Sequence, residues 1–389
     1  MTRSAFRAAP ATVVTRYDPD LPKLGQGNPH RVAPYATGAA PVTLTLARPD
    51  DFHLHLRDGP ELAAVVGHSA ERFARAIVMP NLRPPITTTA LALGYRDRIR
   101  AALPPGSDFE PLMTLYLTDR TDPVEIDRAR ASGAVHAVKY YPAGATTNAD
   151  SGVTDLARAS AVLARMEELD LPLLVHGEWV APDVDPFDRE RVFLERVLSG
   201  VVRSFPALRV VFEHATTREA LDFVRAHPRL AATITPQHLL LSRSALFDGG
   251  IRPHLYCLPV LKREAHRLAL VEAATGGEPR FFLGTDSAPH ARAAKESACG
   301  CAGIYSAHAA LELYAEVFDA AGRLDRLEPF ASHFGADFYG LPRNRGSVVL
   351  ERVPWQVPER FAFGSGELVG LRAGQRVEWR MVGAARTGP

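Results

Sequence analysis

From about residue 41 onward, short apolar runs alternate with longer stretches of helical pattern, and this alternation constrains the fold more than any other feature. Each run is about four to eight residues long and many members are β-branched or aromatic, which is typical of a buried parallel strand. The candidate strands are Val42–Leu46, Ala76–Met79, Leu112–Leu117, Ala134–Tyr140, Leu173–His176, Val210–His214, Ala231–Thr235 and Phe281–Gly284. The candidate helices are Leu91–Leu103, Val124–Ala131, Asp155–Leu169, Asp188–Val201, Thr217–Ala226, Glu264–Ala274 and Ala307–Ala320.

Eight strands separated by helices predict an α/β fold of the closed (β/α)8, TIM-barrel type. The competing fold is an open doubly wound sheet, but no G-x-G-x-x-G motif follows the first strand. We place the barrel in residues 41–342. Beyond it, Ser347–Leu350 and Arg376–Met381 have the pattern of short strands. Residues 343–389 are therefore predicted to form a small C-terminal β extension packed on the barrel.

Residues 1–40 are rich in Ala, Pro, Arg and Thr and show no clear period, so we expect a flexible N-terminal arm. A transit peptide is the alternative, because Arg3, Arg7 and Arg16 precede the first acidic residue.

Charge and cysteine content narrow the class of protein. Lys and Arg number 45 against 44 Asp and Glu, which gives no reason to expect nucleic acid or an anionic membrane as a partner. No apolar run approaches the roughly 18–20 residues that span a bilayer. The three cysteines are an odd number in a long chain, which argues against a disulfide framework and favours a reducing cytoplasm. Such a chain can bury a large core without a structural metal, so a metal here is expected to serve chemistry.

Polar residues stand at the ends of the predicted strands, on the face where a barrel builds its active site. His53 and His55 follow the first strand, and side chains two apart on an extended segment point the same way. His176 and His214 end the fifth and sixth strands, and Asp286 ends the eighth. Taken singly, each histidine could be a satisfied polar residue and Asp286 a helix cap. Together they predict a metal site.

Lys139 ends the fourth strand, and its simplest interpretation is a lysine that emerges into solvent. The alternative is a buried, neutral amine that adds carbon dioxide and becomes a carbamate able to bridge two metal ions. Nitrogen and oxygen ligands without thiolate suit zinc, and two ions about 3.5–4 Å apart form a hydrolytic clamp. Cys299 and Cys301 offer a second, thiolate-based metal hypothesis. The strand-end set favours a binuclear metallohydrolase.

The sequence resembles the amidohydrolase superfamily and, within it, the class II dihydroorotases of bacterial type. The resemblance runs from about Arg48 to about Pro342, leaving the N-terminal arm outside and the tail weakly matched. The segments that carry it are Arg48–Gly59, Ile77–Leu82, Lys139–Ala143, Ala145–Asn148, Leu173–Glu178, Arg252–Pro259 and Gly284–Arg292. These blocks stand in the family's order and at its spacing.

The resemblance implies two zinc ions per chain. The implied ligands are His53, His55, Lys139 as N6-carboxylysine, His176, His214 and Asp286. One ion would be held by the first two histidines and the aspartate, and the other by the remaining two histidines. The carboxylated lysine and a hydroxide would bridge the pair. Zinc, cobalt and manganese share such ligands, so the metal itself stays open.

The resemblance also implies how substrate is bound. The implied contacts are Arg57, Asn81, His176, Leu258, His290 and Ala302. Arg57, Asn81 and His290 would bind a carboxylate, for which the planar guanidinium is well suited, while backbone groups of Leu258 and Ala302 would contact a pyrimidine ring. Thr146 and Thr147 would belong to a loop that closes over the substrate. Gly144 departs from the family pattern, where a larger polar residue is usual, and this leaves the loop's dynamics open.

The activity implied is reversible interconversion of (S)-dihydroorotate and N-carbamoyl-L-aspartate in de novo pyrimidine biosynthesis, by a cytoplasmic homodimer. The bridging hydroxide would attack the ring amide carbonyl, and Asp286 would carry the proton to the ring nitrogen. Hydantoinases, dihydropyrimidinases and allantoinases are the alternatives, since they can share the metal ligands. Their substrates lack a carboxylate, which would leave Arg57, Asn81 and His290 unpaired. A catalytically inactive scaffold is a further alternative, although no implied ligand is missing.

Overall fold

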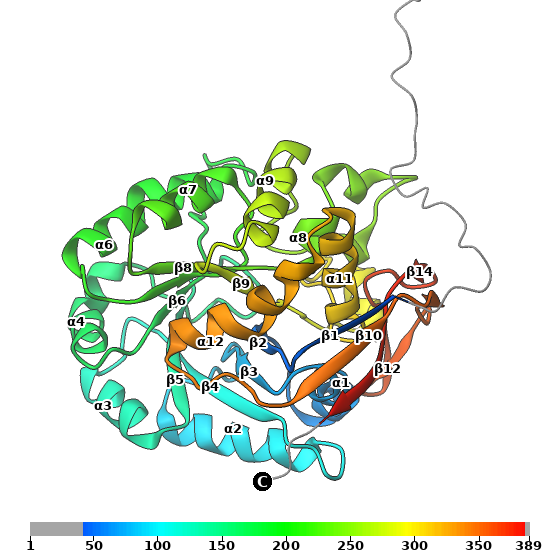
Figure 1. Ribbon diagram of the computed structural model, residues 1–389. Helices are drawn as coiled ribbons and strands as arrows, with labels where there is room; N and C mark the ends of the chain where they lie inside the picture. Colours follow the sequence, from blue (N-terminus) through cyan, green and yellow to red (C-terminus); the bar gives the residue numbers. More distant parts are fainter. Residues whose placement is uncertain (1–41, 386–389) are drawn as a thin grey trace, which may run out of the picture. The chain divides into compact units, whose positions relative to one another are not determined.

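The computed structural model describes residues 42–385, and its centre is a sheet of eight parallel strands (Figure 1). The strands follow one another in the sheet in chain order. They are β2 (Asp50–Leu54), β3 (Arg75–Val78), β4 (Glu110–Tyr116), β5 (Val135–Tyr140), β6 (Leu173–Val175), β7 (Val210–Phe212), β8 (Leu230–Ile234) and β9 (Phe281–Leu283). The predicted (β/α)8 barrel is confirmed. The predicted arm over residues 1–40 lies outside the described residues, and the boundary after residue 342 stays a prediction.

The barrel closes between its first and last strands through the segments that follow them. Leu54 forms a parallel bridge with Ser287. The Asp286 N–H donates to the His53 carbonyl at 2.9 Å, and the His55 N–H donates to the Ser287 carbonyl at 3.2 Å. Closure itself therefore brings His53 and Asp286 side by side, although they stand at opposite ends of the barrel sequence.

Helices surround the barrel, and their ends follow local sequence signals. They are α1 (Gly59–Arg72), α2 (Thr89–Ala102), α3 (Pro123–Ser132), α4 (Ser160–Glu168), α5 (Arg189–Phe193), α6 (Ser199–Ser204), α7 (Arg218–Ala226), α8 (Pro236–Leu240), α9 (Glu264–Thr275), α10 (Arg292–Lys295), α11 (Ala310–Ala320) and α12 (Phe334–Tyr339). In α3, Asp122 accepts from the Val124 N–H at 2.9 Å, Pro123 opens the helix, and Gly133 ends it at a φ of +63°. The helices α1, α8, α10 and α12 were not predicted.

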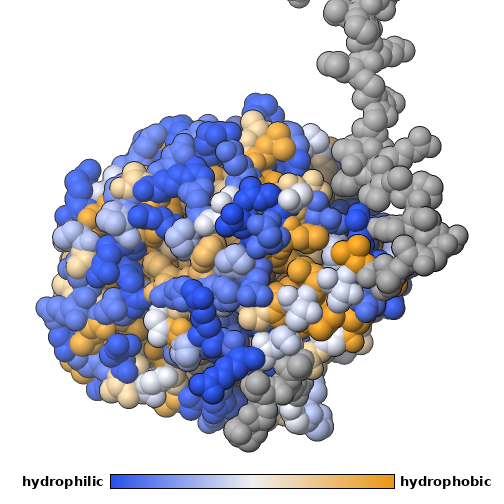
Figure 2. All heavy atoms as spheres, in the orientation of Figure 1, coloured by the Kyte–Doolittle hydropathy of each residue, from blue (hydrophilic) through white to orange (hydrophobic). Residues whose placement is uncertain are grey.

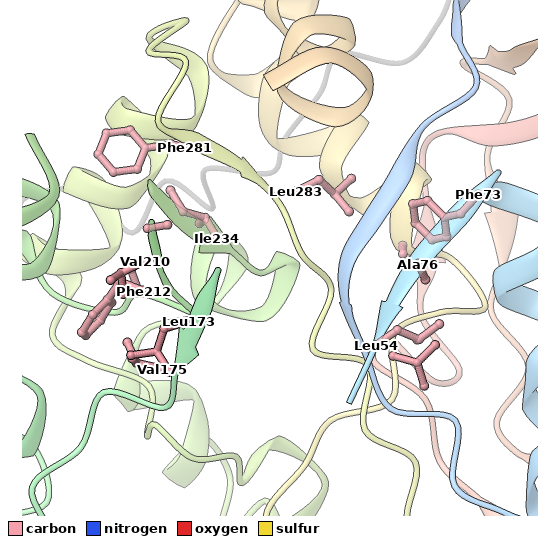
Figure 3. Packing of buried hydrophobic residues seen from close by; sticks show 14 of the residues in the cluster. Leu54, Phe73, Ala76, Leu173, Val175, Val210, Phe212, Ile234, Phe281 and Leu283 are labelled. Atoms are coloured by element: carbon pink, nitrogen blue, oxygen red, sulfur yellow. The ribbon is translucent and has the colours of Figure 1, made fainter. Parts of the chain in front are cut away.

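Alternate residues of each barrel strand enter different hydrophobic layers, as the two-residue period of a strand requires. One layer lies inside the barrel and includes Phe52, Ile77, Leu112, Ala137, Leu174, Val211 and Phe282. The other lies between strands and helices, and Figure 3 shows Leu173 and Val175 of β6 packed with Val210 and Phe212 of β7. The metal and substrate candidates sit above this packed interior, which is a core and not a pore.

The tail forms a separate antiparallel sheet with the segment that precedes the barrel. Strand β1 (Thr43–Ala47) pairs with β10 (Ser347–Glu351), which pairs with β15 (Arg380–Ala385). The prediction that Val42–Leu46 is the first barrel strand is therefore wrong, and β2 takes that place. The remaining tail strands are β11 (Trp355–Gln356), β12 (Phe361–Phe363), β13 (Gly366–Leu368) and β14 (Arg376–Val377).

The face drawn in Figure 2 carries polar side chains over most of its area, with hydrophobic ones interspersed. Scattered exposed hydrophobic residues are normal on a folded domain and carry no functional meaning by themselves. Within residues 42–385, every helix is too short or too polar to cross a membrane.

Candidate active site

A cavity lies at the carboxyl ends of the barrel strands, where such folds place their chemistry. Most of the predicted site residues line it: His53, His55, Arg57, Asn81, Thr146, Thr147, His176, His214, Leu258, Asp286 and Ala302. Lys139 is fully buried beside them, and His290 contacts Arg57 and Ala302. Residues predicted from separate strands are thus brought to one place.

Three donor atoms converge within this cavity. His53 Nε2 lies 3.2 Å from His55 Nε2 and 3.2 Å from Asp286 Oδ1, and His55 Nε2 lies 3.1 Å from the same oxygen. Zinc–nitrogen bonds of about 2.0–2.1 Å in tetrahedral geometry put neighbouring ligand atoms about 3.3–3.4 Å apart. The triangle therefore has the dimensions of one face of a metal coordination sphere.

A second group of donors adjoins the first. His53, Glu213 and His214 have ligand atoms within 4.8 Å of one another. The His214 ring lies 5.1 Å from the His53 ring and 4.8 Å from the His176 ring, measured between centroids. Within residues 42–385, both groups of converging donors lie here and neither includes the cysteine pair. Cys299 Sγ and Cys301 Sγ lie 4.0 Å apart, so the structure gives the thiolate hypothesis no third ligand.

Lys139 extends from β5 into the space between these groups. Its amine contacts the Glu213 carboxylate and lies 4.9 Å from the centre of the Tyr141 ring. Both Lys139 and Glu213 are fully buried. Burial lowers the pKa of Lys139 well below its usual value, because the ammonium form is disfavoured away from water. The solvent-exposed interpretation of this lysine is wrong, and a buried amine with a lowered pKa is the form that reacts with carbon dioxide.

Burial also favours the neutral form of His53, His55 and His214. It lowers the pKa of His55 to about 4 and the pKa of His214 well below its usual value. Asp286 behaves oppositely: burial favours its neutral form, but the imidazoles of His53 and His55 hold its pKa well below the usual range. Neutral imidazole and ionised carboxylate are the protonation states that bind metal ions.

The site holds several buried polar atoms without a hydrogen-bond partner. They include Nδ1 of His214, Oε1 of Glu178 and the Tyr141 hydroxyl, while Nδ1 of His53 and Oε1 of Glu213 face each other at 3.2 Å. Buried polar groups are normally paired, because leaving one unpaired costs about 1–3 kcal/mol. Their concentration at one cavity, together with the donor triangle, fits residues arranged for metal ions and a polar ligand.

The backbone at the site is held in strained conformations. The φ values are +62° at Arg57, +44° at His214 and +46° at Asp286. All three lie in the left-handed region, which costs a residue other than glycine about 1–3 kcal/mol. Asp51 braces the turn at Asp286, because its carboxylate accepts from the Thr285 N–H at 2.8 Å, and it also accepts from the His53 N–H at 3.1 Å. Strain of this kind is retained where the surrounding structure fixes a functional geometry.

A cationic group faces the cavity beside the metal candidates. Arg57 donates from Nε to the Pro289 carbonyl at 2.8 Å, and its Nη2 lies 3.0 Å from His290 Nε2. Burial and the nearby Arg57 lower the pKa of His290 to about 2, so this ring is neutral. His290 Nε2 also lies 3.0 Å from the Ala302 carbonyl. The guanidinium is thus oriented by the Pro289 carbonyl and the His290 ring, and it remains the positive charge at the cavity wall.

The segment with Thr146 and Thr147 lies against the cavity. Asn81 Nδ2 donates to the Thr147 carbonyl at 3.1 Å, and the Thr147 hydroxyl donates to the Ala302 carbonyl at 3.3 Å. Gly144 has a φ of +73°, and a Cβ there would meet no atom within 4 Å. A polar residue such as asparagine tolerates this conformation, so the departure at Gly144 changes backbone freedom and not packing.

Sequence reasoning gave no role to several residues that the structure places here. Tyr141 lines the cavity, Glu213 contacts Lys139, and Glu178 Oε2 lies 2.8 Å from His176 Nε2. One signal was available, since glutamates beside the ends of apolar strands are costly unless they serve a site. Their partners could not be read from that signal.

No family model matches the chain. Two curated relatives are a dihydroorotase of Methylobacillus flagellatus, 64% identical over 87% of this chain and 99% of its own, and one of Azoarcus sp., 66% identical with the same shares. The chain belongs to the dihydroorotase family. A solved dihydroorotase of Campylobacter jejuni aligns with a TM-score of 0.81 at 33% identity, covering 88% of this chain and 98% of that one. These relatives bear out the family resemblance seen in the sequence.

Structures of other cyclic amidases share the fold at lower similarity. L-hydantoinase from Arthrobacter aurescens aligns with a TM-score of 0.72 at 14% identity, covering 87% of this chain and 83% of its own. A dihydroorotase of Saccharomyces cerevisiae in complex with 5-fluoroorotic acid aligns better, with a TM-score of 0.82 at 29% identity and coverage of 89% and 99%. The barrel is common to both groups, and the sequence lies with the dihydroorotases.

Proposed function

We propose that this protein is a binuclear zinc dihydroorotase that interconverts (S)-dihydroorotate and N-carbamoyl-L-aspartate. The observation that carries the proposal is the donor triangle of His53, His55 and Asp286 beside the Arg57 guanidinium. It combines the dimensions of a metal site with a positive charge for a carboxylate. Membership of the dihydroorotase family supports the choice of this substrate over uncharged rings.

In this proposal His53, His55 and Asp286 would hold one zinc ion, and His176 and His214 would hold the other. Lys139, carboxylated on Nζ, would contribute carbamate oxygens to both: its neutral amine forms a bond to carbon dioxide and releases one proton. When bound, the metal ions supply an activated water and polarise the amide carbonyl. The unpaired, buried Nδ1 of His214 supports this assignment, since a metal site leaves such a group without a protein partner.

The remaining chemistry belongs to protein groups. Asp286, ionised in the free protein, accepts the proton of the attacking water and delivers it to the ring nitrogen as the carbon–nitrogen bond breaks. In ring closure the same carboxylate takes that proton back. Arg57, Asn81 and His290 hold the substrate carboxylate, while Leu258 and Ala302 orient the ring through backbone groups. Thr146 and Thr147 belong to a loop that closes over the substrate and excludes water.

The proposal extends to a homodimer in the cytoplasm. Family membership supports the dimer, and the odd number of cysteines supports a reducing compartment. Sedimentation of the full chain tests the first, since a monomer at micromolar concentration would contradict it.

The test is turnover of dihydroorotate and of N-carbamoyl-L-aspartate, with bound metal counted on the same sample and with dihydrouracil and hydantoin as uncharged controls. We expect activity confined to the first pair and about two zinc ions per chain, as a binuclear hydrolase requires. Preference for the uncharged rings would refute the substrate. One ion per chain with full activity would refute the binuclear site.

A variant of the carboxylate contact sharpens this test. Arg57→Lys keeps the charge but loses the planar fork, and we expect KM for dihydroorotate to rise about tenfold or more. Arg98→Lys is the matched control, because Arg98 pairs with Asp58 on the exposed surface. Equal KM values in the two variants would contradict the role of Arg57.

A further inference from the structure

Two backbone segments that are distant in the sequence meet at the wall of the cavity. One contains Leu258 and the other contains Ala302, and both residues line the cavity. The segments are joined directly where the Gly303 N–H donates to the Tyr256 carbonyl at 3.0 Å. A single hydrogen bond between two irregular segments leaves their relative position weakly fixed, so a second connection is needed to hold both in register.

Lys295, the last residue of α10, provides that connection. Its ammonium donates to the carbonyls of Tyr256, Cys301 and Gly303 at 2.7, 2.9 and 2.7 Å. The side chain is only 3% exposed. An ammonium has three N–H donors, and here all three are used on backbone acceptors from both segments. Lys295 therefore connects the two segments through its hydrogen bonds.

The hydrogen bonds of Lys295 determine the direction of the Ala302 carbonyl. The carbonyls on either side of it, those of Cys301 and Gly303, are turned toward Lys295. The Ala302 carbonyl itself is turned away, toward His290 Nε2 at 3.0 Å and the Thr147 hydroxyl at 3.3 Å. Holding the two flanking carbonyls fixes the orientation of the peptide groups between them.

Packing removes the freedom that these peptides would otherwise have. Gly303 has a φ of +151°, and a Cβ added there would lie 2.8 Å from His290 Cδ2 and 2.9 Å from Ala288 Cβ. The segment can therefore approach His290 this closely only with glycine at this position. Lys295 thus contacts Gly303, and Gly303 packs against His290. His290 in turn contacts Arg57.

We propose that Lys295 is a positioning residue for substrate binding, because it holds the Leu258 and Ala302 segments in the orientation that the substrate ring requires. This inference rests on the proposed function, in which backbone groups of those two residues contact the ring. Lys295 does not line the cavity, so it acts through the backbone and not on the reacting atoms.

The chain offers a matched control in a second buried lysine. Lys262 is 4% exposed, but its amine donates to a single carbonyl, that of Val260, at 3.1 Å. Replacing either lysine by methionine removes a buried amine of similar exposure and keeps a long unbranched side chain. Only Lys295→Met removes a connection between the two cavity segments.

The experiment compares steady-state kinetics of the full-length wild type, Lys295→Met and Lys262→Met, with zinc content and melting temperature measured on the same preparations. For Lys295→Met we expect KM for dihydroorotate to rise about tenfold or more while kcat falls less than about threefold, the signature of lost binding that is uniform along the reaction. For Lys262→Met we expect KM within about twofold of wild type. A purely structural role would lower the melting temperature of both variants without this division between KM and kcat.

Specific outcomes would overturn the inference. An unchanged KM in Lys295→Met would show that the backbone keeps its orientation without the amine, and a fall in kcat with loss of zinc would assign the residue to the metal site. If Lys295→Met does not fold, Lys295→Arg takes its place. Its planar fork cannot direct donors at all three carbonyls, so a wild-type KM in that variant also overturns the inference. Absence of dihydroorotate turnover in the wild type would instead refute the proposed function.

Discussion

The two ends of the barrel both bury charged residues, but the two ends differ in what those residues contact. At the amino end, the Asp50 carboxylate accepts from Arg75 at 3.0 and 2.5 Å and from Asn344 at 2.8 Å. At the carboxyl end, Nε2 of His53 and of His55 instead converge on Asp286 Oδ1, and Nδ1 of His214 has no hydrogen-bond partner. A closed charge pair at one end contributes to stability, whereas converging ligand atoms at the other end are available to metal and substrate.

The largest effect should come from Asp286 at the carboxyl end. Asp286→Asn keeps an oxygen in the donor triangle but cannot accept the proton, so kcat should fall about 10²–10⁴-fold. The free energy of unfolding should also fall, because a carboxylate whose pKa is held below its usual range stabilises the folded protein in its ionised form. Kinetics and denaturant unfolding of the same preparation measure both, with zinc counted. Wild-type turnover would exclude Asp286 as the proton carrier.

A substitution at the amino end should lower stability and leave kcat nearly unchanged. Arg75→Met leaves the fully buried Asp50 without its bidentate partner, and we expect a loss of about 3–5 kcal/mol in the free energy of unfolding. The kcat of the folded fraction should stay within about twofold of wild type, because the barrel interior separates the two ends. A large loss of kcat at full stability would erase the distinction between the ends.

A pH profile should reveal the lysine that links the cavity segments. Burial lowers the pKa of Lys295 to about 8. Below that pH the ammonium has three donors for its three carbonyls, and above it the amine has two, so KM should rise as pH increases through 8. Of the titratable groups around it, burial raises the pKa of Cys257 to about 12, keeps the pKa of Cys301 above its usual value, and holds His290 neutral. In Lys295→Arg, whose guanidinium does not titrate, KM should stay flat over the same range.

The smallest effect is expected at an exposed ion pair that follows the barrel. Arg343 and Asp337 lie 2.6 Å apart, with side chains 53% and 49% exposed. Arg343→Ala should cost about 0.2–1 kcal/mol of stability and leave kcat unchanged, because solvent screens such a pair. A loss as large as that of Arg75→Met would show that proximity, and not burial, sets the value of these pairs.

Much of the barrel and of the site could be predicted from the sequence, because both leave a pattern within single segments of the chain. Seven predicted strands coincide with β3 to β9 to within a few residues, since an apolar run flanked by turn residues needs no distant information. The residues proposed as metal ligands stand at the ends of those runs. Polar side chains there are costly unless a site uses them, so their positions alone indicate chemistry.

The first barrel strand shows where local pattern fails. Val42–Leu46 has the alternation of a strand and does form most of one, but it pairs with β10 from the tail. The segment Asp50–Leu54 contains two aspartates and a histidine, so its pattern is polar although every residue in it is buried. Its aspartates are satisfied by Arg75, Asn344 and Thr285, partners that lie far away in the sequence.

The sequence by itself determined the fold class and predicted most of the side chains that line the cavity. Only the tertiary structure decided which of their atoms meet: closure of β2 on β9 brings His53 to Asp286, and Lys295 finds three carbonyls from two separate segments. The physical reason is that periodicity and burial are properties of single segments, whereas a hydrogen bond depends on the position and direction of two.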